Sequence, residues 1–316
     1  MTNQFAALAT SSLAFWCGIA ALASAAEPGA VSQRKPLATP PAFSQEVLDV
    51  FFPDARRMLG PKPVPAATPS PTETPAGAAI VKAGQQRWSQ VVSAAVLEDE
   101  VKRLSAEVAA DTRTPSEFTA TGQKRLRPTF STLAVVFGVI GQFDGPVRWQ
   151  TEAPGLRDEC ARAARNLKAA SEATLREAKS RGEELAALVR GERVEVPAAE
   201  VEASWAELVD RRALMSRLET AERDRLRPAL ASRATFAGQR DEIAHEAALL
   251  RLLAGVIHAE GFEYSDDEAF GEHADDFAAR CRQLLEATEG DDFEKARAAL
   301  TELSKSCDRC HGDFRS

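Results

Sequence analysis

Residues 243–257 of this chain read IAHEAALLRLLAGVI, an apolar run long enough for a buried helix. A second run, Leu133 to Ile140, has the same character and lies inside a helical stretch at 116–143. Ala, Leu, Glu, Arg and Asp dominate the chain, and clusters of β-branched residues are few. The sequence therefore predicts an all-α protein in which these two runs form buried helices.

Amphipathic helices are predicted on both sides of each run, from apolar residues at helical spacing. The first half contains three such stretches: 78–111, 152–170 and 172–190, the last of them stopped by Gly191. In the second half the apolar stripe consists of Trp205, Leu208, Val209, Met215 and Leu218. Residues 267–287 and 292–310 supply two further helices.

The two halves share one plan, which indicates a duplication. Trp88 and Phe118 are 30 residues apart, and Trp205 and Phe236 are 31 apart. Amphipathic helices with short connections pack as antiparallel bundles. We therefore predict two tandem four-helix bundles, at residues 80–192 and 200–316. One long irregular helical array is the alternative.

The N-terminal region predicts export. Residues 5–22 are apolar and uncharged, and small residues follow, as in a secretory signal peptide that occupies residues 1–26. A membrane anchor is the alternative, because the stretch approaches spanning length. Residues 27–79 read as a Pro/Ala-rich linker with one short helix between two Pro-rich pieces. After cleavage the chain is expected to have no membrane segment and to be periplasmic or otherwise exported.

Composition excludes two broad classes of function. The chain has 39 Lys+Arg against 47 Asp+Glu, a net charge of -8, whereas nucleic-acid binding needs a basic face. No nucleophile constellation, carboxylate dyad or glycine-rich phosphate loop is visible. We therefore expect neither a nucleic-acid partner nor an enzyme that transforms a substrate.

The C-terminal tail carries Cys307-Asp-Arg-Cys310-His311, the Cys-x-x-Cys-His attachment signature of c-type haem. Two thiols three positions apart on one helical turn can form thioethers to the two vinyl groups of one porphyrin, and the adjacent His then ligates the iron. With 5 Cys and 4 His among 316 residues, the pattern is expected by chance about 0.001 times. The sequence predicts one covalent haem c.

Three other interpretations of the cysteine pair are open. A zinc half-site needs two further N or S ligands, and Cys160 and Cys281 are isolated in different helices. A thioredoxin-like redox pair needs a βαβ context, and a disulfide between Cys307 and Cys310 would be strained. Cys160 and Cys281 are expected to be buried small apolar residues.

A four-helix bundle whose last helix ends in Cys-x-x-Cys-His resembles the cytochrome c-prime family. The resemblance covers residues 200–316, and the first bundle looks like the same fold without haem. The family carries Arg-x-x-x-Met on its first helix, matched here by Arg211-Arg-Ala-Leu-Met215. The resemblance implies that Met215 is the distal iron ligand and that Arg211 partners a haem propionate.

The residues themselves give modest support to that ligand. Met215 shares its stripe with Trp205, and aligning Trp88 with Trp205 pairs Met215 with Glu98 and Arg211 with Ala94. The half without the cysteines thus also lacks the Met and the Arg. An open or water-occupied position and His245 are the alternatives. His258 and His273 are weaker candidates, with His273 expected to be solvated within an acidic run, and Trp205 and Phe236 either pack on the porphyrin or serve the core.

Electron transfer is the leading function predicted from these features, with an unidentified redox protein as the partner. The acidic run between 266 and 276 could steer a basic one. A five-coordinate haem that binds nitric oxide or carbon monoxide, for sensing or detoxification, is the first alternative. A haem-bearing interaction module is the second. The bundles are expected to pair either within one chain or as a homodimer.

Overall fold

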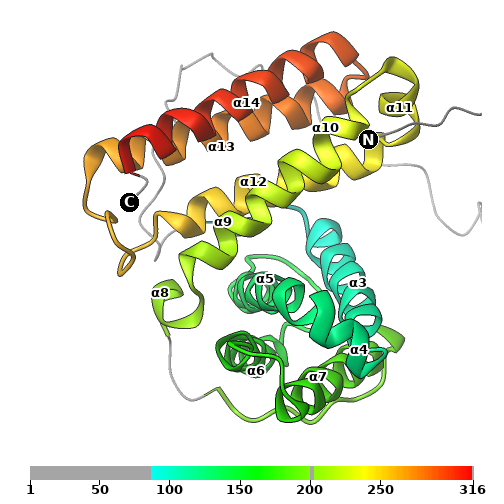
Figure 1. The fold of residues 1–316 in the computed structure, drawn as a ribbon. Helices are drawn as coiled ribbons and strands as arrows, with labels where there is room; N and C mark the ends of the chain where they lie inside the picture. The colour runs from blue at the N-terminus through cyan, green and yellow to red at the C-terminus, as the bar shows by residue number, and fades with distance from the viewer. Residues whose placement is uncertain (1–86, 200–202, 315–316) are drawn as a thin grey trace, which may run out of the picture. The chain divides into compact units, whose positions relative to one another are not determined.

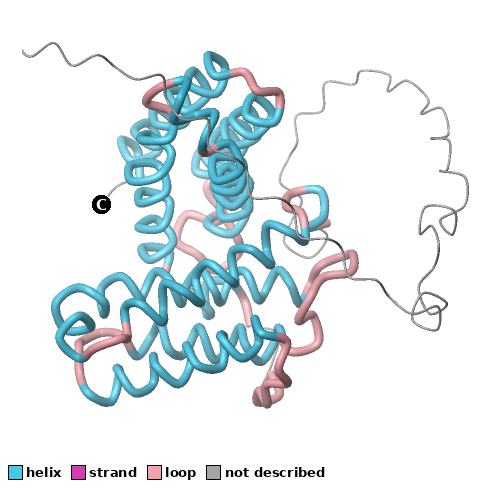
Figure 2. Tube along the Cα trace, turned by 90° about the vertical axis from the view of Figure 1, so that its right-hand side faces the viewer, coloured by secondary structure: helices cyan, strands magenta, loops and turns pink. Residues whose placement is uncertain are grey.

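The computed structural model describes residues 87–199 and 203–314. Every described residue belongs to one compact unit, which lies within residues 74–316. The expected signal peptide and Pro-rich linker therefore lie outside the described residues. Every regular element in the described part is helical, which confirms the all-α fold class (Figures 1 and 2). None of these helices is long and apolar enough to cross a membrane.

The N-terminal bundle is built from the elements η1 (Trp88–Gln90), α3 (Ala94–Asp111), α4 (Pro115–Glu117), the π-helical turn η2 (Phe118–Gly122), α5 (Gln123–Gly141), α6 (Ala153–Asn166) and α7 (Glu172–Arg190). Its first long helix begins later than predicted. Ser93 is extended, and its hydroxyl accepts a hydrogen bond from the Val96 N–H, so the cap sets the start at Ala94 rather than at 78. Gly191, at φ 83°, ends α7 as predicted.

The C-terminal bundle is built from α8 (Trp205–Leu208), α9 (Arg211–Thr220), the π-helical turn η3 (Ala221–Leu226), α10 (Arg227–Ala229), α11 (Arg233–Gly238), α12 (Arg240–Ile257), α13 (Glu268–Glu289) and α14 (Phe293–Phe314). The predicted single stripe from Trp205 to Leu218 is wrong. Val209 is extended at ψ 147°, and the Asp210 carboxylate caps α9 by accepting from the Arg212 N–H. Trp205 is thereby separated from the helix that carries Met215.

The two apolar runs that mark the sequence are the buried centres of the bundles. The side chains from Leu133 to Ile140 lie on α5 and are buried throughout, and α12 buries most of its apolar residues completely. α5 begins at Gln123 and α12 at Arg240, 117 positions apart, and α3 and α9 begin with the same offset.

The two bundles differ in how closely their first and last long helices pack together. In the N-terminal bundle α3, α5, α6 and α7 form a closed ring of packed neighbours. In the C-terminal bundle α9 packs on α12, α12 on α13 and α13 on α14, but α9 and α14 pack together far less than α3 and α7 do. Gly182 permits the tight α3–α7 contact, because a Cβ at that position would lie 2.9 Å from Val108 Cγ1. The ring of the C-terminal bundle is therefore open between α9 and α14.

Gly182→Leu should destabilise the chain by about 1–3 kcal/mol, because the added side chain overpacks the α3–α7 contact. Urea denaturation followed by circular dichroism measures the change. Gly238→Leu, at a position where an added Cβ meets nothing within 4 Å, is the matched control and should be close to neutral. Equal effects of the two substitutions would contradict the close packing inferred at Gly182.

Candidate functional site

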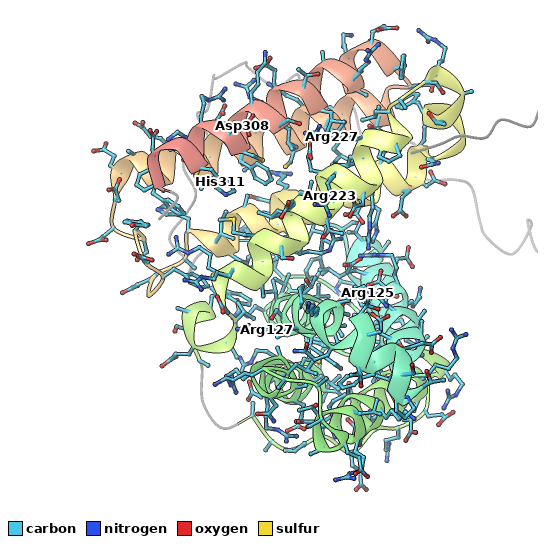
Figure 3. The ribbon with its side chains drawn as sticks, viewed as in Figure 1. Arg125, Arg127, Arg223, Arg227, Asp308 and His311 are labelled. Atoms are coloured by element: carbon cyan, nitrogen blue, oxygen red, sulfur yellow. The ribbon has the colours of Figure 1, made fainter. Side chains whose placement is uncertain are left out.

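The Cys-x-x-Cys-His motif lies on the last turns of α14. Cys307 and Cys310 are half-buried, and His311 is exposed (Figure 3 labels His311 and its neighbour Asp308). Residues at spacings of three and four share one face of a helix, so the two thiols and the imidazole all point to one side of this turn. Among the described residues, no atom lies within 4 Å of a Cβ placed on Gly312.

Two contacts fix which helix this face of α14 opposes. The Ser304 hydroxyl, two turns before His311 and on the same face, donates to Glu222 Oε1 of η3. At the other end, the Arg211 guanidinium at the start of α9 lies over the ring of Phe270, which packs on Phe314 at the end of α14, and its charge opposes the rise in the pKa of Cys310. The chain from Arg211 to Glu222 therefore runs antiparallel to the end of α14.

Met215 lies between these two contacts. Arg211, Met215 and Glu222 recur at helical spacing along one face of α9 and η3, so Met215 points toward the same side as its neighbours that meet α14. By this register Met215 stands opposite the turn that holds Cys307 and His311. Its side chain is half-buried and packs against the core, whereas Leu214 beside it is fully buried.

Both thiols of the motif are held in their protonated form at neutral pH. Burial, together with the nearby carboxylates of Glu222 and Asp308, raises the pKa of Cys307 to about 11. Burial and the charge of Asp313 raise the pKa of Cys310, and Arg211 opposes that rise. The site thus presents two neutral sulfur atoms on one helical turn.

An aromatic cluster at the end of α14 encloses Arg211, and sequence reasoning missed it. The guanidinium lies over the rings of Phe262, Tyr264 and Phe270 at 5.5, 5.9 and 5.0 Å, and it donates to the Glu263 carbonyl. Phe314 packs 5.2 Å from both Tyr264 and Phe270. The available signals were weak: the single Tyr of the chain, and an aromatic residue three positions after His311. Arg211 is thereby held near the C-terminal end of α14.

Trp205 and Phe236 are not brought to the motif, which corrects the prediction that they pack on a porphyrin. The Trp205 ring fits against Gly138 of α5 and lies 6.1 Å from Trp88 in an edge-on arrangement. Phe236 packs 5.6 Å from Phe293, at the opposite end of α14 from Cys307, about 21 Å away at 1.5 Å per residue. Packing between helices accounts for both rings.

His245 does not face the motif either. Its Nε2 is hydrogen-bonded to Glu100 Oε2 at 2.9 Å, which places it against α3 of the N-terminal bundle. We expected His273 to be solvated within the acidic run, but its ring has partners in the protein. Its Nε2 meets Asp313 Oδ2 at 2.9 Å, and its ring lies 5.8 Å from Phe314. His258 packs on Phe270.

Cys160 and Cys281 are buried, as predicted, and burial raises the pKa of both thiols. Within 87–199 and 203–314, no group of three or more His, Cys, Asp or Glu side chains is arranged to hold a metal ion. The zinc interpretation of Cys307 and Cys310 therefore finds no further ligands among these residues. The same described ranges contain no strand, so a thioredoxin-like setting is not seen either.

Residues 258–315 match the family model for Cytochrome C'. The matched segment is cytochrome c-prime-like, as the sequence resemblance predicted, and it implies binding of haem of the c type. It includes α13, α14 and the aromatic cluster, and it leaves out α9 with Arg211 and Met215. Comparison with curated proteins and with solved structures finds no match for this chain.

The residues of the cytochrome c-prime-like region fit the haem that the family implies. The two thiols and the imidazole of the motif point together, and the side of α14 that carries Ser304 and the motif faces α9, where the ring of helices is open. The corresponding side of the N-terminal bundle is closed by direct packing of α3 on α7. α9 and α14 are thus less closely packed than the corresponding pair, α3 and α7, in the bundle without the motif.

Proposed function

We propose that the protein is an exported c-type cytochrome that carries one covalent haem and transfers electrons. In this proposal Cys307 and Cys310 hold the porphyrin, His311 is the axial ligand from α14, and Met215 is the ligand from α9. A haem held in this way supplies a one-electron couple whose potential is raised by a His/Met ligand pair.

One observation carries the proposal: the C-terminal bundle is open between α9 and α14, where the motif stands opposite Met215. Side-chain contacts lie at both ends of the region between α9 and α14. The Ser304–Glu222 hydrogen bond lies at one end, and Arg211 with its aromatic cluster lies at the other. In the proposed holoprotein these residues would flank the haem, where neighbouring side chains tune the redox potential of the iron.

Spectra of the wild-type protein and of Met215→Ala in both redox states test the proposal. The oxidised wild-type protein should show a Met-to-iron charge-transfer band, and its reduced form should be low-spin. Met215→Ala should lose the band completely, because removal of the thioether opens one axial position. Met58→Ala, at the other internal Met of the chain, is the matched control and should keep the band.

Unchanged spectra of Met215→Ala would mean that this sulfur is not bound to iron. A wild-type spectrum that is high-spin and shifts on addition of carbon monoxide would favour the alternative, a five-coordinate haem that binds nitric oxide or carbon monoxide. An interaction module, in which the haemless bundle binds another protein, is compatible with either spectrum.

Export is part of the proposal, because bacteria attach haem covalently outside the cytoplasm. The partner would be a redox protein, and the acidic side chains between 266 and 276 would attract a basic one. The role is electron carriage, without transformation of a substrate.

In this proposal the two bundles of one chain pair with each other, rather than with the bundles of a second chain. Trp88 contacts Trp205 and Glu100 contacts Arg217, and in both pairs the partners are 117 positions apart. Equivalent residues meet each other where two copies are related by a two-fold axis. These two contacts, and the shared offset of the helix starts, support a duplicated chain whose halves pack as dimer subunits do.

A further inference from the structure

The helix that carries Met215 is held mainly by the bundle that lacks the motif. α9 packs on α5 of the N-terminal bundle more extensively than on α12 of its own bundle, and it barely meets α14. The start of α9 is tied to the same bundle, because Arg127 of α5 donates to Asp210 at 2.7 Å. In an ordinary closed ring, α9 would be oriented by α14.

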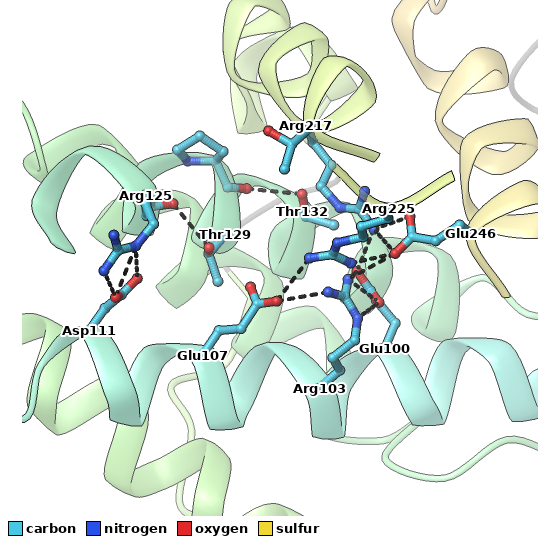
Figure 4. A network of polar contacts seen from close by, with 12 residues as sticks. Glu100, Arg103, Glu107, Asp111, Arg125, Thr129, Thr132, Arg217, Arg225 and Glu246 are labelled. Carbon is cyan, nitrogen blue, oxygen red and sulfur yellow. Dashed lines mark hydrogen bonds and ion pairs between the residues drawn. The ribbon is translucent and has the colours of Figure 1, made fainter. Parts of the chain in front are cut away.

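A buried ion network joins α9 to both bundles (Figure 4). The Arg217 guanidinium of α9 lies 2.8 Å from Glu246 Oε2 of α12 and 3.5 Å from Glu100 Oε1 of α3. The two carboxylates are fully buried, and Arg217 is 5% exposed. Arg103 donates to Glu100 at 2.6 Å, and Arg225 pairs with Glu246. A charge buried to this degree cannot leave its partners without a large desolvation cost.

The position of Arg217 on α9 links this network to the candidate site. Arg217 follows Met215 by two residues, which places the two side chains about 200° apart around the helix. A guanidinium fixed between Glu100 and Glu246 therefore fixes the rotation of α9 that turns Met215 toward α14. The contacts at Glu222 and Arg211 lie on that same side.

We infer that the haemless bundle is a positioning scaffold for the haem site, which acts on α9 through Glu100 and Arg217 and sets how Met215 is presented to α14. This inference rests on the proposed function. It gives Glu100 and Arg217 the role of positioning residues, although neither belongs to the motif and Glu100 lies in the other bundle.

The test uses the full holoprotein with Glu100→Gln, which keeps the shape of the side chain and removes its charge. The Met-to-iron band of the oxidised form should fall at least twofold and the reduction potential should shift, while the mass still shows one covalent haem. Glu117→Gln, which removes an exposed carboxylate from the same bundle, is the matched control and should leave both readouts unchanged. Glu100→Asp, which retains the carboxylate, should restore the band at least in part.

A second readout does not depend on haem. Amide hydrogen exchange is measured over residues 211–220 of the Cys307→Ala/Cys310→Ala chain. It should become about tenfold faster when Glu100→Gln is added, because Arg217 of α9 then loses a charged partner. A tenfold change corresponds to about 1.4 kcal/mol of local stability. The Glu117→Gln control should not change it. If Glu100→Gln prevents folding, Arg217→Lys is measured in the same two ways, with the same expected results.

Two results separate failure of the inference from failure of the proposed function. If Met215→Ala abolishes the band while Glu100→Gln and Arg217→Lys leave the band, the potential and the exchange of α9 unchanged, the scaffold role is overturned and the cytochrome stands. If Met215→Ala leaves the spectra unchanged, the ligand assignment fails, and the exchange of α9 alone then decides whether the bundle positions this helix.

Discussion

A Cys307→Ala/Cys310→Ala chain, exported and purified as the wild type is, is expected to carry no covalent haem. The half-buried thiols of these two residues are the attachment points in the proposed function, so their removal leaves His311 as a single weak anchor. Intact-mass measurement should give the bare processed chain, and acid acetone should extract all pigment. The wild-type mass should be higher by one haem and should survive the same extraction.

The matched control uses the two other described cysteines. Cys160→Ala/Cys281→Ala removes two thiols that are fully buried inside the bundles, and it should leave one haem per chain. Covalent haem on the Cys307→Ala/Cys310→Ala chain would remove the basis of the proposed function. Single substitutions should each leave one thioether, with pigment that is still retained.

Glu246→Ala is expected to have the second largest effect, a loss of about 3–5 kcal/mol of unfolding free energy. Glu246 is fully buried on α12 and is paired with Arg217 and Arg225. Its removal leaves the buried Arg217 guanidinium, and the Arg225 guanidinium at its edge, short of a carboxylate partner. Urea denaturation at pH 7, followed by circular dichroism, measures the loss. Glu219→Ala, which breaks an exposed pair with Arg223, should cost no more than about 1 kcal/mol.

The difference between wild type and Glu246→Ala should shrink in acid. Burial by itself would raise the pKa of Glu246, but Arg217 and Arg225 outweigh it, so the pKa lies below the ordinary 4.5. A lowered carboxyl pKa contributes stability that is present above pH 4.5 and is lost as the pH falls toward the folded-state value. The same sign holds for Glu100, whose pKa Arg217, His245 and Arg103 together hold well below its usual range against the effect of burial. A difference that stays constant from pH 7 to pH 3 would contradict this assignment.

Much of the fold could be predicted because it depends on patterns among residues that are close in the sequence. The apolar runs at 133–140 and 243–257 are buried on α5 and α12, and Gly191 ends α7, since helix periodicity and stop signals act over a few residues. The break at Val209 and the cap at Ser93 were not predicted. Apolar residues at helical spacing continue across both positions, and that spacing does not show where the backbone becomes extended.

The Cys-x-x-Cys-His motif, and the class of cofactor that it predicts, could be recognised from the sequence alone. Covalent attachment with axial ligation needs three residues, two Cys and one His, at fixed spacing on one helical turn, and that spacing is visible without any fold. The family match at 258–315 agrees with it. The assignment of Trp205 and Phe236 to the site failed for the opposite reason: a large apolar ring has the same appearance in a sequence wherever it packs.

What only the tertiary structure decided is which helices meet. The contacts of Arg211 with Phe270, of Glu222 with Ser304 and of Arg217 with Glu100 and Glu246 join residues far apart in the chain, and no local pattern encodes such pairings. The open side between α9 and α14 is likewise a property of packing, since it depends on how four helices share one core. The sequence alone determined the chemistry of the tail. The packing of the bundles decided where that tail faces and what holds the helix opposite it.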